Sequence, residues 1–398
     1  MTTDISIDEK GLCDFLQALV RIPSINPPGN EGPAAEMIAG HLRQLGLEIE
    51  ILGPEPSRPS VLARLKGSGG GPTLLLNGHT DVQPAGSGWK HDPFGAEMEG
   101  GRLFGRGSVD MKAGLAAVVY AVEALRRAQV RLKGDLVITA VADEVGGGHQ
   151  GTGFLARIGK LQANMAVVCE PTGDCVNVAH RGTVWIEIEV RGRSAHGGRP
   201  WLGVNAISKV AKVAQAIEED LVPRLKGRTH PLLPAPTINF GTIHGGNKFN
   251  LVADHCVLQI DRRTVPGETV AEVLKQVEDL CATVRRSDPE TFEYSVREVM
   301  HVNPAEISPE AQIVRECKRA YKEIRGIEPG IGSTAGFEDM HFIMEAGIPT
   351  AMFGPYRRQS AKEPAFFTTS GMADEYVDIP DVVLAARIYA RLIQNLLG

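Results

Sequence analysis

The 398-residue sequence lacks features that mark several classes of protein. Its six cysteines include no C-x-x-C pair, which argues against a structural zinc site or a disulfide framework and favours reduced thiols in a cytoplasm. No apolar run approaches the roughly 20 residues of a membrane span, and the opening MTTDISIDEKGL has neither region of a signal peptide. A formal net charge of −6 argues against a nucleic-acid surface. We therefore expect a cytoplasmic protein that binds neither nucleic acid nor a membrane.

The first part of the chain alternates helix and strand signals. Residues 32–46 and 111–128 have apolar residues at helical spacing, whereas 72–79 and 134–142 are short apolar runs typical of buried strands. Strands separated by helices of this length predict an α/β domain, with a mostly parallel sheet and helices on both faces.

The pattern changes near residue 180. Residues 183–192 alternate apolar and polar side chains, as in a half-exposed antiparallel strand, and further alternating strands and two helices follow. We expect an inserted α+β domain over residues 180–298, with residues 1–179 and 299–398 forming the other domain. Two domains also agree with the length of the chain.

Polar side chains follow the strands of the predicted parallel sheet, at the edge where such sheets bind ligands. They are His79 and Asp81 after one strand, Asp110 between a glycine-rich loop and a helix, Asp143 and Glu144 after another strand, and Glu170 after a third. Carboxylates gathered out of water repel one another unless a cation lies among them. Histidine with carboxylates suits Zn²⁺, Co²⁺ or Mn²⁺ better than Ca²⁺. We expect Asp81 to accept the second ring N–H of His79.

Simpler interpretations of these residues stay open. His79 is also compatible with a hydrogen-bonded turn, and Asp110 with a helix N-cap. Asp143 and Glu144 are also compatible with a solvated loop, and Glu170 with a turn. The metal hypothesis rests on their joint occurrence at consecutive strand ends of one sheet.

Several motifs in order along nearly the whole chain resemble those of a known family. GHTDVQPAG, GGRLFGRGSVDMKAGLAA, DEVGG, CEPTG, GRSAHGGRPWLGVNAI and GIPTAMFGP resemble the zinc-dependent metallopeptidase family of acetylornithine deacetylases, succinyl-diaminopimelate desuccinylases, aminoacylases and glutamate carboxypeptidases. The resemblance implies a two-metal amidohydrolase whose catalytic domain is interrupted by a lid domain through which the chain forms a homodimer.

The resemblance also implies metal ligands. His79 and Glu170 match the ligands of one metal, Asp110 the ligand that bridges to a second metal, and Glu144 a ligand of that second metal. Asp81, as the residue that orients His79, is expected to be one of the catalytic residues.

Further positions match catalytic and substrate-binding residues of the family. Asp143 matches the general base, and His196 matches the residue that stabilises the oxyanion, often from the partner subunit. Asn250 and Arg263 match lid residues that hold the substrate's carboxylate. Alternatively, His196 and Asn250 only stabilise loops, and Arg263 pairs with Asp261.

Two positions depart from the family pattern. The general base is normally Glu, one methylene longer than Asp143. The last metal ligand is normally a histidine in the stretch that here reads SGMADEYV, where Gly371 stands in its place. His341 is a candidate substitute ligand. We therefore expect one firmly bound metal and a second that is weak or absent.

The leading functional hypothesis is a metal-dependent hydrolase of an amide bond in a small carboxylate-bearing substrate, such as an N-acyl amino acid or a dipeptide. The alternatives are a single-metal aminohydrolase or deaminase, and a catalytically inactive binding homologue.

Overall fold

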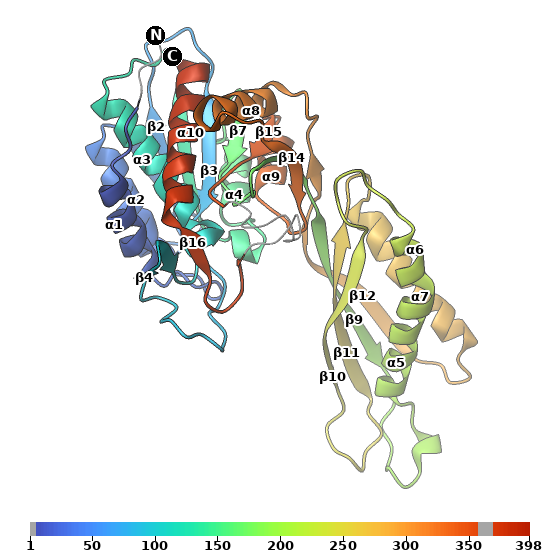
Figure 1. Ribbon diagram of the computed structural model, residues 1–398. Coiled ribbons are helices and arrows are strands. Elements are labelled where there is room, and N and C mark those ends of the chain that lie inside the picture. Colours follow the sequence, from blue (N-terminus) through green and yellow to red (C-terminus); the bar gives the residue numbers. More distant parts are fainter. Residues whose placement is uncertain (1–4, 357–368) are drawn as a thin grey trace. The chain divides into compact units, whose positions relative to one another are not determined.

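The computed structural model describes residues 5–356 and 369–398 and divides into two compact units (Figure 1). The first comprises Met1–Val178, Ile307–Thr334 and Glu338–Gly398. The second comprises Ala179–Glu306 and Ala335–Phe337. The expected boundary at residue 298 falls inside strand β12 (Glu293–Val302), the last long strand of the second unit.

The first unit contains most of a sheet with the strand order β1-β2-β6-β3-β7-β15-β8-β13, in which β14 also pairs with β8. Strand β13 and the last two residues of β8 fall in the range of the second unit. The strands are β1 (Glu48–Leu52), β2 (Ser60–Leu65), β3 (Leu74–His79), β6 (Leu136–Val141), β7 (Met165–Val168), β8 (Cys175–His180), β13 (Ala305–Glu306), β14 (Gly330–Thr334) and β15 (Thr350–Met352). The four central strands β6, β3, β7 and β15 are parallel, whereas the pairs at the flanks are antiparallel. Strand β15 lies between β7 and β8, although β7 and β8 are consecutive along the chain.

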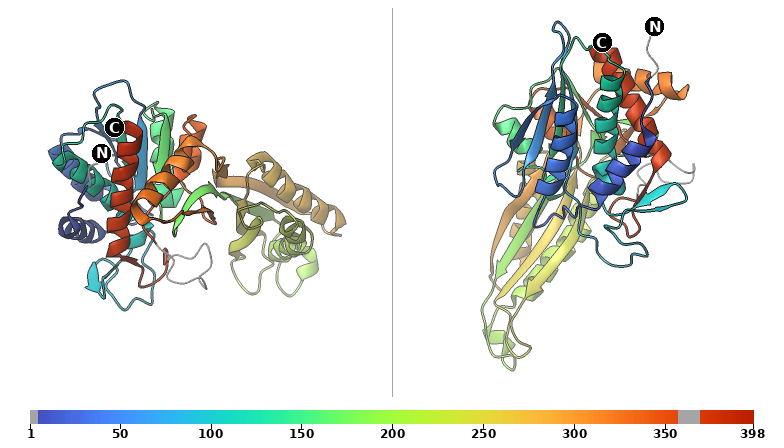
Figure 2. Two further views of the ribbon diagram at one scale, coloured as in Figure 1. Left: turned by 45° about the horizontal axis from the view of Figure 1, so that its top comes forward. Right: turned by 90° about the vertical axis from the view of Figure 1, so that its left-hand side faces the viewer.

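Helices cover this sheet. They are α1 (Glu9–Val20), α2 (Gly32–Gln44), α3 (Ala113–Arg127), α4 (Thr152–Arg157), α8 (Gln312–Arg325), α9 (Met340–Glu345) and α10 (Ile379–Leu397). α10 packs between α3 and α8 (Figures 1 and 2). Every residue of β3 and β6 is buried, as is required of a strand covered on both faces. The α/β prediction is confirmed, with antiparallel strands added at the flanks.

A small three-stranded sheet joins the C-terminal segment to the loop before Asp110. Its order is β16-β5-β4, with β4 (Glu97–Glu99), β5 (Arg102–Phe104) and β16 (Tyr376–Asp378). The pairing places Tyr376 opposite Phe104. Residues just before Tyr376 are thereby brought to the loop that carries Asp110.

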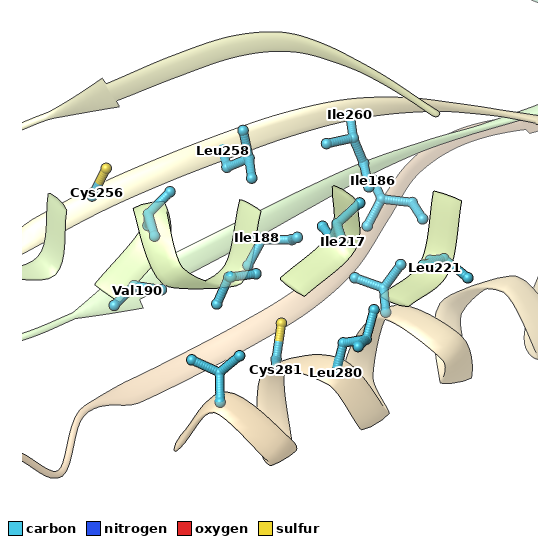
Figure 3. Packing of buried hydrophobic residues seen from close by; sticks show 14 of the residues in the cluster. Ile186, Ile188, Val190, Ile217, Leu221, Cys256, Leu258, Ile260, Leu280 and Cys281 are labelled. Carbon is cyan, nitrogen blue, oxygen red and sulfur yellow. The ribbon is translucent and has the colours of Figure 1, made fainter. Parts of the chain in front are cut away.

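The second unit is a four-stranded antiparallel sheet with the order β10-β11-β9-β12. Its remaining elements are β9 (Gly182–Arg191), β10 (Thr237–Gly245), β11 (His255–Thr264), α5 (Ala206–Ala216), α6 (Val222–Lys226) and α7 (Val270–Ser287). Alternate residues of β9, such as Ile186 and Ile188, are buried and pack with Leu258 of β11 and Leu280 of α7 (Figure 3). The alternation in the sequence therefore predicts the buried face of this strand.

All six cysteines lie in the described residues, and none of them forms a disulfide bond there. Across residues 5–356 and 369–398, no helix is long and apolar enough to cross a membrane.

Candidate metal centre

His79 is the last residue of β3 and is buried. Its Nδ1 lies 2.9 Å from the main-chain carbonyl oxygen of Asp81 and 3.4 Å from Asp81 Oδ1. The ring N–H of His79 is therefore bound by Asp81, as expected, but the main-chain carbonyl of Asp81 lies closer to it than the carboxylate does. This contact orients Nε2 towards the acidic residues at the neighbouring strand ends.

Three carboxylates surround Nε2 of His79. The distances are 3.0 Å to Asp110 Oδ1, 3.3 Å to Glu170 Oε1 and 3.7 Å to Glu144 Oε2. His79, Asp110 and Glu170 each offer one ligand atom, and these atoms lie within 4.8 Å of one another. One imidazole and two carboxylates with a position open for water are a typical ligand set of a catalytic metal.

The electrostatics of this cluster also favour a cation. Burial acts to lower the pKa of His79, but Glu170 and Asp110 outweigh it and raise the pKa well above its usual value. Burial raises the pKa of Glu170, and repulsion from Asp110 adds to the rise. Burial also raises the pKa of Glu144 well above the usual range, and repulsion from Glu338 and Glu170 adds to it. A divalent ion among these groups removes the repulsion, so the residues present fit a metal.

Asp81 connects two strand ends. Its carboxylate accepts hydrogen bonds from the backbone N–H groups of Glu144, at 3.2 Å, and Val145, at 3.1 Å. Asn26 Nδ2 donates to Asp81 Oδ2 at 2.8 Å. Asp81 therefore fixes the turn that presents Glu144 to His79.

Asp143 lies in the same turn but is bound elsewhere. Its Oδ1 forms an ion pair with Arg58 Nη2 at 3.0 Å, and its Oδ2 accepts the backbone N–H of Gln150 at 2.9 Å. Arg58 is held in turn by the buried Glu31, at 2.7 Å. Both carboxylate oxygens of the expected general base thus have partners, and its backbone adopts the left-handed region, with φ 72°.

The segment expected to supply the last metal ligand contributes something else. Gly371 has φ +73°, and a Cβ built there meets Gln83 Oε1 at 3.0 Å. The hydroxyl of Ser370, one residue earlier, donates to Asp110 Oδ2. His341 is buried in α9 with its ring against Phe342, and within the described ranges it is not part of the ligand cluster.

Two further acidic residues of the site, Glu338 and Asp339, are not among the residues that the sequence motifs indicate. Burial raises the pKa of Glu338 well above its usual value, and nearby Glu170 and Asp110 raise it further. Asp339 accepts a hydrogen bond from Thr152 at 2.7 Å, and burial raises its pKa to about 7. The sequence indicates them only as the acidic pair in GFEDMH. This pair lies after the inserted domain and does not directly follow a predicted strand, so strand ends do not point to it.

His196, Asn250 and Arg263 all belong to the second unit. The backbone N–H of Gly197 donates to the Asn250 carbonyl at 2.8 Å, so the loops of His196 and Asn250 lie side by side. Arg263 Nε donates to Asp261 Oδ2 at 2.9 Å. The alternative pairing of Arg263 with Asp261 is therefore present.

Comparison with known proteins agrees with this architecture. The profile of Peptidase family M20/M25/M40 matches residues 75–395. An N-formyl-4-amino-5-aminomethyl-2-methylpyrimidine deformylase of Halalkalibacterium halodurans is 30% identical over 383 residues, covering 89% of each chain. An acetylornithine deacetylase of Proteus mirabilis is 31% identical over 399 residues, covering 96% of each.

Solved structures show the same fold. The aminopeptidase PepT of Bacillus cereus has a TM-score of 0.75 at 20% identity, covering 98% of this chain and 99% of its own. The dipeptidase Dug1p of Saccharomyces cerevisiae has a TM-score of 0.80 at 15% identity, covering 97% and 95%.

Proposed function

The chain belongs to Peptidase family M20/M25/M40, a family of metal-dependent hydrolases, and from this premise we propose that it hydrolyses the amide bond of a small N-acyl substrate that carries a carboxylate. N-acyl amino acids and dipeptides are the substrate class. The observation that carries the proposal is the group of buried His79, buried Glu170 and half-buried Asp110 at the carboxyl end of the parallel strands.

These three residues would hold one divalent ion, Zn²⁺ or alternatively Co²⁺ or Mn²⁺. When bound, such an ion supplies Lewis acidity to a water molecule and to the scissile carbonyl. A second ion would have only Asp110 and Glu144 of the expected set, because Gly371 offers no ligand atom. One firmly bound metal per chain is therefore proposed.

Glu144 is the proposed proton acceptor in this single-metal site. Its Oε2 lies 3.7 Å from Nε2 of His79, so it is close to a water molecule bound at the cluster, as a general base must be. Glu144 takes the proton from water and passes it to the leaving amine. Asp143, ion-paired with Arg58, keeps the turn of Glu144 in place.

The second unit is proposed to bind the rest of the substrate and to form a homodimer. His196 would stabilise the oxyanion, and Asn250 and Arg263 would bind the substrate's carboxylate. Strand β10 is an edge of its sheet, and a hollow of about 510 Å³ beside it is lined by Ile207, Phe249 and Leu251, all exposed. An unpaired edge with exposed apolar side chains favours pairing with a second copy.

The test is a screen of N-formyl, N-acetyl and N-succinyl amino acids and of dipeptides, with release of the free amine as the readout. Protein stripped with dipicolinate should be inactive and should recover on addition of Zn²⁺, Co²⁺ or Mn²⁺. Full turnover by metal-free protein would refute the proposal. Release of ammonia instead of an amine would identify an aminohydrolase, and binding without turnover would identify an inactive homologue.

A further inference from the structure

The two carboxylate oxygens of Asp110 have different partners. Oδ1 lies 3.0 Å from His79 Nε2, on the side of the ligand cluster. Oδ2 accepts the hydroxyl of Ser370. A carboxylate that bridges two metals needs one oxygen for each of them, and here the second oxygen already has a donor.

The turn that carries Ser370 is held at several points. Thr369 Oγ1 donates to the carbonyl of Tyr376 at 3.0 Å and accepts its backbone N–H at 3.2 Å. The backbone N–H of Met372 donates to the Thr369 carbonyl at 3.1 Å. Arg106 Nη2 donates to the Gly371 carbonyl at 3.3 Å. The Ser370 hydroxyl is thus presented to Asp110 by an anchored backbone.

The same turn directs residue 371 elsewhere. A side chain there would begin against Gln83 Oε1, 3.0 Å from its Cβ, in a backbone region that residues with side chains rarely adopt. Ser370 is therefore the residue of this segment that faces the Asp110 carboxylate, although Gly371 occupies the place of the expected histidine.

We propose that Ser370 is a positioning residue whose hydroxyl takes the place of a second metal at Asp110 and so makes the centre mononuclear. The hydroxyl holds the carboxylate with Oδ1 towards the first metal, and it satisfies the oxygen that a second ion would need. This inference rests on the proposed function, because it presupposes a metal at His79, Asp110 and Glu170.

Metal binding tests the inference without any substrate. Purified protein is stripped and then titrated with Co²⁺ in equilibrium dialysis, with elemental analysis and the visible spectrum of the bound ion as readouts. The unmodified protein should bind one ion per chain. Ser370→Ala should weaken that binding by roughly 10- to 100-fold, the usual cost of losing a partner of a ligand, and should alter the spectrum. Ser370→Thr, which keeps the hydroxyl, should restore both.

A matched pair of histidine variants tests the direction of the segment. Ser370→His should raise the stoichiometry towards two ions, because a side chain at 370 faces Asp110. Gly371→His should stay at one ion, because a side chain at 371 faces Gln83. Circular dichroism verifies that each variant is folded.

Three results would overturn the inference. They are two tightly bound ions in the unmodified protein, unchanged affinity and spectrum in Ser370→Ala, and a second ion gained by Gly371→His but not by Ser370→His. One bound ion without any amide hydrolysis would refute only the proposed function. Failure of the unmodified protein to bind metal would refute both.

Discussion

Glu375 Oε1 accepts the backbone N–H of Asp110 at 3.3 Å. The same oxygen accepts the N–H groups of Gly107, at 3.0 Å, and Val109, at 3.2 Å. Its other carboxylate oxygen pairs with Arg106 at 2.5 Å, and both side chains are buried. A residue near the C-terminus thus shapes the loop that presents a metal ligand.

We expect Glu375→Gln to weaken metal binding by roughly 10- to 100-fold, as loss of an outer-shell partner usually does. The variant leaves Arg106 buried without its counter-charge, so its melting temperature should also fall. Equilibrium dialysis and thermal unfolding measure the two effects. Glu310→Gln, at an exposed glutamate, is the control and should change neither. Unaltered metal affinity in Glu375→Gln would contradict the role of this carboxylate.

Single amide substitutions of Asp143 and Glu144 should identify which of the two carboxylates accepts the proton. Glu144→Gln should lower kcat by about 10²- to 10⁴-fold while the bound metal is retained. Asp143→Asn should mainly cost stability, about 1.5–3 kcal/mol for a lost charge-assisted hydrogen bond, because it breaks the contact with Arg58. Steady-state kinetics and elemental analysis on both variants decide the matter. Inactivation by Asp143→Asn alone would return the base to Asp143.

Arg263→Ala should raise KM with little change in kcat if the guanidinium binds the substrate's carboxylate. The ion pair with Asp261 uses Nε, and a guanidinium still offers its Nη groups. Loss of one charged hydrogen bond, about 1.5–3 kcal/mol, corresponds to roughly 10- to 100-fold in KM. Arg297→Ala, at an exposed residue of the same unit, is the control. Equal KM values for the two variants would exclude Arg263 from the substrate site.

Light scattering at micromolar concentration should find a dimer. Ile243 is exposed on the edge strand β10, and Val299 is exposed on the opposite edge strand, β12. Ile243→Lys should shift the mass towards the monomer, because it places a charge at the proposed interface. Val299→Lys should leave the dimer intact. A strictly monomeric unmodified protein would rule out the assembly.

The second unit contains an ion cluster whose contribution to stability should depend on pH. Lys209 and Lys212 each lie 2.7 Å from the carboxylate of Asp288, whose side chain is fully buried. Burial acts to raise the pKa of Asp288, but the hydrogen bonds from the two lysines outweigh it and hold the pKa below its usual value. The stabilisation is therefore complete above the unfolded-state pKa of about 3.9, and is lost as pH falls through the folded-state value.

Asp288→Asn should accordingly destabilise the protein at pH 7 by about 3 kcal/mol, the scale of breaking a buried ion pair. The difference in the free energy of unfolding between this variant and the unmodified protein should become smaller below about pH 4. Asp279→Asn, in an exposed helical pair with Lys275, should leave the stability nearly unchanged, because solvent screens exposed ion pairs. Thermal unfolding across this pH range is the measurement. A difference independent of pH would show that the charge of Asp288 is not what stabilises the unit.

The ligand cluster was predictable because parallel strands end at one edge of a sheet. His79 ends a strand that is recognisable from its apolar run, and Glu170 follows another, so sheet geometry alone brings them together. Asp110 is predictable at the same edge because it lies between a glycine-rich loop and the start of a helix. The buried face of β9 followed from the alternation of its side chains.

Other features depend on backbone detail that residue patterns do not encode. The ion pair of Arg58 with Asp143 joins a loop before β2 to the end of β6. The direction of Gly371 depends on a single left-handed residue. Ser370 gave no signal of its own, because its contact with Asp110 arises from the turn that Arg106 and Tyr376 hold.

The position of β15 between β7 and β8 has a consequence for synthesis of the chain. Strand β8 ends at His180, whereas β15 begins at Thr350. Strand β15, which pairs with both β7 and β8, is therefore the last strand of this sheet to be synthesised. At about 5–20 residues per second, roughly 10–30 s pass between the two. During that interval the emerging polypeptide has a gap in its central sheet with two apolar edges open, and Glu375 has not yet been made. The ribosome-bound chain should therefore need chaperone protection, and it should acquire full metal affinity only after Glu375 has been made.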